Sequence, residues 1–186
     1  MNRREAVQNI TLLLGGTLVG MNAFLTGCKT NTGKTEAFTA DDIAYLDEIA
    51  DTILPTTSTP GAKAAKVGQF MTVMVNDCYE EKDQKAFREG MDKINEQSKK
   101  EFNNSFMKIT PEQRHQLLVK LDAEAKEHQK NKKPEDTAHY FRLMKELTLL
   151  GYFTSEIGST QARRYVAVPG RFEGCVPYKK GDKAWA

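Results

Sequence analysis

The chain has 186 residues, with 27 Lys and Arg side chains against 25 Asp and Glu side chains, a net charge of +2. This near balance argues against a nucleic-acid partner, because nucleic-acid-binding domains are usually basic or carry a basic stripe. Three cysteines, without a C-x-x-C, C-x-x-C-H or H-E-x-x-H spacing, argue against a disulfide scaffold and against the common zinc and covalent-haem motifs. The length favours one domain.

Residues 1–27 are predicted to be an export signal. Arg3 and Arg4 give a basic start, and residues 10–25 are mostly apolar and carry no charge. The apolar stretch is shorter than the roughly 20 residues that span a bilayer, which is typical of a cleaved signal. The paired arginines are compatible with the twin-arginine route for folded proteins. The residues after them depart from the usual apolar pattern of that route, so export of the unfolded chain stays open.

The residues Leu25-Thr26-Gly27-Cys28 resemble the lipobox of bacterial lipoproteins. The alternative is a chance L-T-G-C sequence within an ordinary helix. We expect acylated Cys28 to begin the mature chain and to anchor it in a lipid membrane, because each buried methylene contributes about 0.8 kcal/mol. Lys29 is not an acidic retention signal, so we expect a cell-envelope lipoprotein that faces the periplasm, in the outer rather than the inner membrane. Residues 28–37 are predicted to be a flexible tether.

Residues 38–186 are predicted to form a helical domain. Thr39 is a typical N-cap, and Leu54-Pro55 ends the helix that follows it. Thr110-Pro111-Glu112-Gln113 is a second strong helix start. Further helical patterns run from Val67 to Cys78, over the charged stretch Asp77 to Gln97, and from Thr137 to about Ile157. Because no segment alternates as a strand would, we predict an all-α fold, a small helical bundle.

The inner faces of these helices follow from helical spacing. The expected buried positions are Ile43, Leu46, Ile49, Ala50, Ile53, Val67, Phe70, Met71, Met74, Val75, Cys78, Phe87, Met91, Ile94, Leu117, Leu118, Leu121, Ala125, Tyr140, Phe141, Met144, Leu147, Leu150 and Phe153. The last 30 residues instead form an irregular C-terminal tail rich in aromatic residues, Gly and Pro. Tyr165, Phe172, Tyr178 and Trp185 must cover either the core of the bundle or a partner.

Few residues suggest chemistry. Glu112-x-x-His115 and Asp136-x-x-His139 have the spacing seen in di-iron bundles, but both acids lie in predicted first helical turns, where the helix dipole already explains them. His128 is expected at the surface. There is no G-x-S-x-G and no dinucleotide fingerprint in the mature chain. We predict no catalytic, cofactor-binding or metal-binding residue on this chain.

Cys78 and Cys175 remain once Cys28 is assigned to lipid. In an oxidising periplasm they are expected to form a disulfide that pins the tail to the second helix. A bridge closing about 100 residues is worth around 4–5 kcal/mol in the chain-entropy model. The alternative is two free, buried thiols.

Several segments together resemble the gluconate 2-dehydrogenase subunit 3 family. They are the R-R export signal, D-x-I-L-P-T-T-S-T-P-G-A at 51–62, V-x-x-F-M-x-x-M-V-x-D-C at 67–78, and Y-V-A-V-P-G-R-F-E-G-C-V-P at 165–177. The resemblance implies a small subunit without a cofactor that accompanies a large FAD-containing flavoprotein of the glucose-methanol-choline type. The large subunit would oxidise a sugar or sugar acid and pass electrons to a quinone or a c-type cytochrome.

We therefore expect an accessory subunit that anchors, matures or escorts a periplasmic FAD-dependent dehydrogenase. The rigid loop 55–62 and the aromatic tail are the candidate contacts with the partner, although the loop could simply turn the chain between helices. The alternative is a stand-alone periplasmic lipoprotein that binds a ligand or an envelope component. The candidate contact residues are Pro55, Thr59, Pro60, Gly61, Tyr165, Pro169, Phe172 and Trp185.

Overall fold

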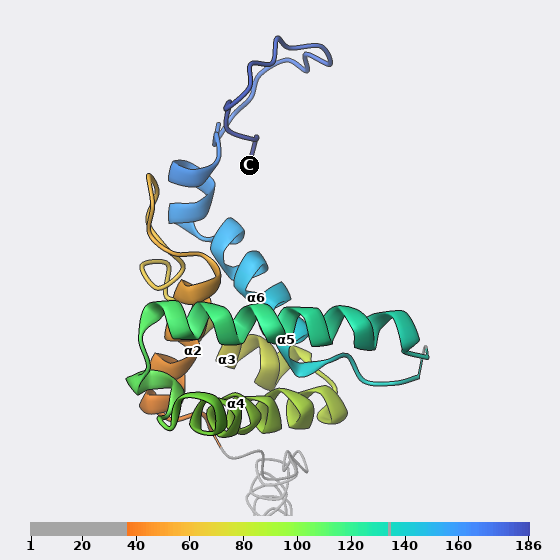
Figure 1. Ribbon diagram of the computed structural model, residues 1–186. Helices are drawn as coiled ribbons and strands as arrows, with labels where there is room; N and C mark the ends of the chain where they lie inside the picture. The colour runs from red at the N-terminus through yellow and green to blue at the C-terminus, as the bar shows by residue number, and fades with distance from the viewer. Residues whose placement is uncertain (1–36, 134) are drawn as a thin grey trace, which may run out of the picture. The chain divides into compact units, whose positions relative to one another are not determined.

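The computed structural model describes residues 37–133 and 135–186 (Figure 1). In these ranges the chain is helical, and the predicted all-α class is confirmed. The elements are α2 (Ala40–Ile53), α3 (Val67–Cys78), α4 (Glu81–Phe102), the 3-10 helix η1 (Phe106–Lys108), α5 (Pro111–Asn131), α6 (Tyr140–Thr154) and the π-helical turn η2 (Gly158–Ala162). None of the described helices is both long and apolar enough to cross a membrane.

The predicted signal, the lipobox that ends at Cys28 and the tether up to residue 36 lie outside the described residues. These features stay predictions. The compact unit that the structure describes runs from Phe38 to Ala186.

The two helix starts that the sequence predicted are both present as capping boxes. The Thr39 hydroxyl accepts from the Asp42 N–H at 3.2 Å, and the Asp42 carboxylate accepts from the Thr39 N–H at 2.8 Å. Thr110 and Gln113 form the same reciprocal pair at 3.3 and 3.0 Å. Each box satisfies two backbone donors at a helix N-terminus that lack a partner within the helix.

Helix α6 is the central element, because it packs against α2, α3, α4 and α5 (Figure 1). Its sequence is correspondingly apolar around much of its circumference. The largest fully buried side chains come from each of α2 to α6 and from η1: Leu46, Ile49, Val67, Met71, Val75, Phe87, Ile94, Phe106, Leu117, Leu121, Phe141 and Met144. Most of the positions that helical spacing assigned to the core are therefore buried or half-buried.

Two predicted inner positions were wrong. Cys78 is exposed, because it is the last residue of α3 and Tyr79 after it is already extended. Leu150 is 45% exposed. The buried stripe of α6 runs instead through Leu147, Thr148 and Gly151, so that the small Gly151 lies against the ring of Phe70.

The boundaries of two helices also differ from the prediction. The charged helix begins at Glu81, after a break at Tyr79. Helix α6 begins at Tyr140 because His139 serves as its N-cap: His139 Nδ1 accepts from the Phe141 N–H at 3.3 Å. The His139 ring lies 5.7 Å, centroid to centroid, from the ring of His128 on α5.

The His139 cap should make stability depend on pH. Burial first, and then the neighbouring His128 and Lys93, lower the pKa of His139 below its ordinary value of 6.5, against the opposing charge of Glu124. The unfolded chain therefore binds the proton more readily, so the cap's contribution is present above about pH 6.5 and is lost as the pH falls.

We expect His139→Asn, which keeps an N-cap acceptor that does not titrate, to flatten the loss of unfolding free energy between about pH 7.5 and 5.5. Urea unfolding at several pH values measures this. His115→Asn, at an exposed histidine of α5, should leave the wild-type dependence unchanged. Identical slopes for His139→Asn and wild type would contradict the prediction.

Candidate partner-binding surface

The loop between α2 and the turn before α3, residues 54–62, contains the predicted rigid loop 55–62 and is closed by hydrogen bonds of its own backbone. Helix α2 ends at Ile53 because the residue before a proline disfavours helical geometry. The Leu54 carbonyl then accepts from the Ala62 N–H at 2.9 Å, which joins the two ends of the loop. Within it, the Thr57 N–H donates to the Thr59 carbonyl at 3.0 Å. The Pro- and Thr-rich segment is therefore a defined turn and not a loose connection.

Gly61 fits the loop because there is no room for a side chain. Its N–H donates to the Thr56 hydroxyl at 3.0 Å. A Cβ at this position would lie 2.5 Å from the Asp51 carboxylate and 2.7 Å from the Thr56 nitrogen. The Asp51 carboxylate also accepts from the Lys63 N–H at 3.4 Å, so α2 holds the loop at its exit.

Helix α6 holds the other side of the loop. The hydroxyl of the buried Tyr152 donates to the Pro60 carbonyl at 2.6 Å. Pro60 and Thr59 are half-buried as a result, whereas residues 55–58 are exposed. The loop thus offers Pro55 and the residues after it to solvent, next to the C-terminal end of α6 (Figure 1). Gly61 is buried, and the close packing within the loop is sufficient to explain why a glycine occupies this position.

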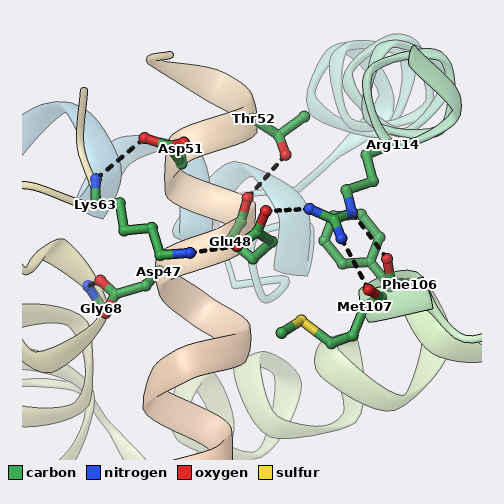
Figure 2. Close-up of polar contacts among 9 residues, drawn as sticks. All are labelled: Asp47, Glu48, Asp51, Thr52, Lys63, Gly68, Phe106, Met107 and Arg114. Carbon is green, nitrogen blue, oxygen red and sulfur yellow. Dashed lines mark hydrogen bonds and ion pairs between the residues drawn. The ribbon is translucent and has the colours of Figure 1, made fainter. Parts of the chain in front are cut away.

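A carboxylate on α2 connects this helix with two other parts of the domain (Figure 2). Glu48 pairs with Lys63, in the turn before α3, at 2.7 Å, and with Arg114 of α5. Arg114 also donates to the carbonyls of Phe106 and Met107 at 3.0 and 2.9 Å. The Glu48 and Arg114 side chains are only 19% and 12% exposed, so solvent screens this pair less than the surface pairs of the protein.

The balance of forces on Glu48 favours the charged form. Burial alone would raise the pKa of Glu48, but the hydrogen bonds and charges of Lys63 and Arg114 outweigh burial and hold it below its ordinary value. Asp47, the preceding residue, accepts from the Gly68 N–H at 2.7 Å. Burial raises the pKa of Asp47, and this hydrogen bond opposes the rise. A Cβ at Gly68 would lie 2.5 Å from the Ile43 carbonyl, so α2 and α3 approach closely here.

An open pocket of about 480 Å³ lies between the end of α2 and the start of α5. Glu112 and His115, the first of the two di-iron-like patterns, line it and are exposed. Asp136 is exposed, and His139 caps α6. Within residues 37–133 and 135–186, no group of three or more His, Cys, Asp or Glu side chains could hold a metal ion. The two patterns therefore contribute to helix starts and to the surface.

The residues after η2 form a C-terminal arm, defined here as residues 163–186. Of its predicted contact residues, Tyr165, Phe172 and Trp185 are 58%, 94% and 53% exposed, and Pro169 is exposed as well. None of them packs against the core cluster. The tail's aromatic residues were expected to cover either the core of the bundle or a partner, and in the structure they do not cover the core. The loop and the start of the arm lie near the same end of α6, since Tyr152 contacts Pro60 and the arm follows η2 directly.

The two remaining cysteines are free thiols in the structure, and both are exposed. Cys78 ends α3, where its thiol lies 3.9 Å from the Met74 sulfur, and Cys175 lies in the arm. The bridge between them stays a prediction. Because both thiols are exposed, the alternative of two free, buried thiols is wrong.

Sequence reasoning did not single out Glu48, Arg114 or Tyr152. A signal existed for Tyr152, which follows Met144 and Thr148 at four-residue spacing on the buried face of α6. Glu48 and Arg114 are 66 residues apart, so only the tertiary fold brings the two charges together. For the predicted contact residues, the structure brings the loop and the start of the arm to one end of α6.

Comparison with known proteins supplies the remaining observation. A family model described as gluconate 2-dehydrogenase subunit 3 matches residues 40–170. The match spans the described elements from α2 to η2 and includes the loop, and it ends within the arm. No curated protein and no solved structure gives a significant match.

Removing the charge of Glu48 should destabilise the fold. Glu48→Gln leaves Arg114 and Lys63 without their carboxylate, and we expect the free energy of unfolding to fall by about 1–3 kcal/mol. Glu89→Gln is the matched control, because Glu89 forms only exposed pairs with Lys85 and Lys93 at 3.8 and 3.7 Å. That change should stay within about 0.5 kcal/mol of wild type. Equal effects of the two substitutions in urea unfolding would refute the role of Glu48.

Tyr152→Phe should release the loop without emptying the core. Only the hydroxyl bonded to the Pro60 carbonyl is lost, so we expect a loss of about 1 kcal/mol in unfolding free energy. We also expect faster tryptic cleavage after the exposed Lys63. Tyr178→Phe, at a hydroxyl in the exposed arm, is the control. An unchanged cleavage rate at Lys63 would show that the hydroxyl does not hold the loop.

Proposed function

The chain belongs to the gluconate 2-dehydrogenase subunit 3 family, and we propose that it anchors and matures the FAD-containing large subunit of a dehydrogenase complex in the cell envelope. The observation that carries the proposal is the family match over residues 40–170, which supports the role of an accessory subunit in a gluconate dehydrogenase complex. The large subunit would be a flavoprotein of the glucose-methanol-choline type that oxidises a sugar or sugar acid. The FAD would be bound there, since the mature sequence has no dinucleotide fingerprint.

The placement of the candidate contacts supports docking at one end of the helical domain. The exposed part of the loop, residues 55–58, and the start of the arm lie near the same end of α6. Both are anchored to helices, the loop by Asp51 and Tyr152 and the arm by η2. A surface that is already ordered loses less conformational entropy on binding, which favours association with a partner.

The membrane anchor is a separate part of the proposal. Acylated Cys28, followed by the polar tether, would hold the complex at the periplasmic face of the membrane, in the outer membrane in preference to the inner. Two or three acyl chains suffice for stable anchoring. The export route of the folded complex would use the paired Arg3 and Arg4, with the small subunit escorting the large one. A c-type cytochrome would complete the complex as electron acceptor.

Purification from native membranes tests this function. An affinity tag inserted after the exposed Glu135 avoids both the lipid anchor and the arm. We expect the detergent-solubilised full chain to carry a large subunit with flavin absorbance. Recovery of the chain alone and monodisperse would instead favour a stand-alone lipoprotein that binds a ligand or an envelope component.

The anchor is tested by replacing the acylated thiol. Cys28→Ser should move both the chain and the flavin from the membrane to the soluble fraction, because the acyl chains are lost. Cys78→Ser, which changes the cysteine at the end of α3, is the matched control and should leave the chain in the membrane. If Cys28→Ser leaves the chain in the membrane, the lipoprotein assignment fails while the subunit assignment stands.

A further inference from the structure

The C-terminal arm exposes apolar side chains that the helical domain does not cover. Val168 is 83% exposed, Phe172 is 94% exposed and Tyr178 is 75% exposed. Isolated exposed apolar residues are common on protein surfaces, but these three belong to one short segment that extends from η2 (Figure 1). The arm has the apolar and aromatic composition of an interface core, and among the described residues none of these three side chains packs against the buried core of the helical domain.

The net positive charge of the chain comes from the arm. Residues 163–186 contain six basic and two acidic side chains, a net charge of +4. The whole chain carries +2, so residues 1–162 carry −2. The charge asymmetry is therefore confined to the segment that also exposes the apolar side chains.

The two acidic side chains of the arm are already engaged within it. Glu173 pairs with Arg171 at 2.5 Å, and the Asp182 carboxylate accepts from the Lys179 N–H at 2.9 Å. In the part of the chain that the structure describes, no carboxylate forms an ion pair with Lys179 or Lys180. These two charges, next to Tyr178, are available to an acidic surface.

The arm is closed at its base. The Arg164 N–H donates to the Ala184 carbonyl at 2.8 Å, and the Ala186 N–H donates to the Arg164 carbonyl at 2.9 Å. The Arg164 guanidinium lies 4.3 Å from the centroid of the Trp185 ring, and the Lys183 ammonium donates to the Gln161 carbonyl. The final residues thus return to the end of η2. The arm is therefore a closed loop, and both of its ends are attached to the helical domain at η2.

We propose that the C-terminal arm docks into an apolar cleft with an acidic rim on the large subunit of the complex. Val168 and Phe172 enter the cleft, and Lys179 and Lys180 pair with carboxylates at its rim. This assignment rests on the proposed function and adds to it the chemistry of the partner surface. The match to the family model ends at residue 170, before Phe172 and the two lysines.

An anionic membrane is the competing occupant for an apolar and basic segment. Segments that lie in the membrane interface are typically helices with one apolar and one basic face. The arm is instead an irregular loop with a turn at Lys179–Asp182, and Glu173 and Asp182 would be brought toward anionic headgroups. The geometry therefore favours a protein cleft.

The test uses the tagged full chain purified from native membranes, with bound flavin per chain as the readout. We expect Val168→Ser with Phe172→Ser, and separately Lys179→Glu with Lys180→Glu, each to lower the recovered flavin about tenfold or more. Matched controls are Val119→Ser, at a 54% exposed position on α5, and Lys132→Glu with Lys133→Glu in the connector. Both controls should recover flavin as wild type does. Thermal unfolding by circular dichroism, unchanged in the arm variants, confirms that they fold.

Wild-type flavin recovery by both arm variants would overturn the arm assignment and leave the proposed function intact. Absence of flavin with the wild-type chain would instead refute the proposed function. Trypsin supplies a second readout: the arm should be cut after Arg171, Lys179 and Lys180 in the free chain and protected in the complex. Cutting at equal rates in both states would also overturn the assignment.

Vesicles of phosphatidylglycerol and phosphatidylcholine separate the two occupants. The unlipidated full chain, Cys28→Ser, should not sediment with them beyond the level of the same chain carrying Val168→Ser and Phe172→Ser. Sedimentation that the two arm substitutions abolish would assign the arm to the membrane and overturn the protein cleft.

Discussion

The half-buried carboxylate of Glu48 is the group on which the position of the loop between α2 and α3 depends. It lies on α2, the helix that leads into the loop, and it is held by Arg114 of α5 and by Lys63 in the turn that leaves the loop. Burying a carboxylate costs free energy unless its charge is met, and here two cations meet it. Because one cation comes from each side, the two ion pairs hold α2 against α5 and against the turn before α3. The two ends of the loop are therefore held in place as well, since the loop joins α2 to that turn.

The loop illustrates what can be read from residues that are close in sequence. Pro55 and Pro60 predicted a rigid loop, since each proline fixes the backbone at its own position, and the structure shows a turn closed by backbone hydrogen bonds. The capping residues Thr39 and Thr110 were predicted for the same reason, because an N-cap acts on N–H groups two or three residues away. What these residues could not show is that Tyr152 holds the loop through the Pro60 carbonyl, 92 residues away.

The errors arise at the ends of helices, where spacing alone gives the wrong face or boundary. Cys78 continues the apolar stripe of α3, yet the helix stops at that residue and leaves the thiol outside the core. Leu150 has a suitable spacing on α6, but the small Gly151 takes the inner face because Phe70 packs there. His139 was considered as a metal ligand, whereas its imidazole serves as an N-cap. In each case the deciding contact comes from another part of the fold or from a helix end.

The loop and the arm expose their side chains at different energetic cost. Exposing the loop costs little free energy, since its exposed residues are mostly polar and several of its backbone groups form hydrogen bonds within the domain. The arm exposes aromatic and aliphatic side chains, which water disfavours at roughly 25 cal/mol per Å² of apolar surface. Ordering a free segment costs a further 1–2 kcal/mol or so per residue.

The clamp of Arg164 on Trp185 and on the backbone of Ala184 and Ala186 lowers that second cost before any partner arrives, because both ends of the arm are already fixed. A partner that covers Phe172 then gains the apolar area and meets a smaller entropic penalty. An exposed aromatic tail without a clamp would be a liability in an isolated chain. With the clamp, the exposed arm would meet the proposed partner at a smaller entropic cost.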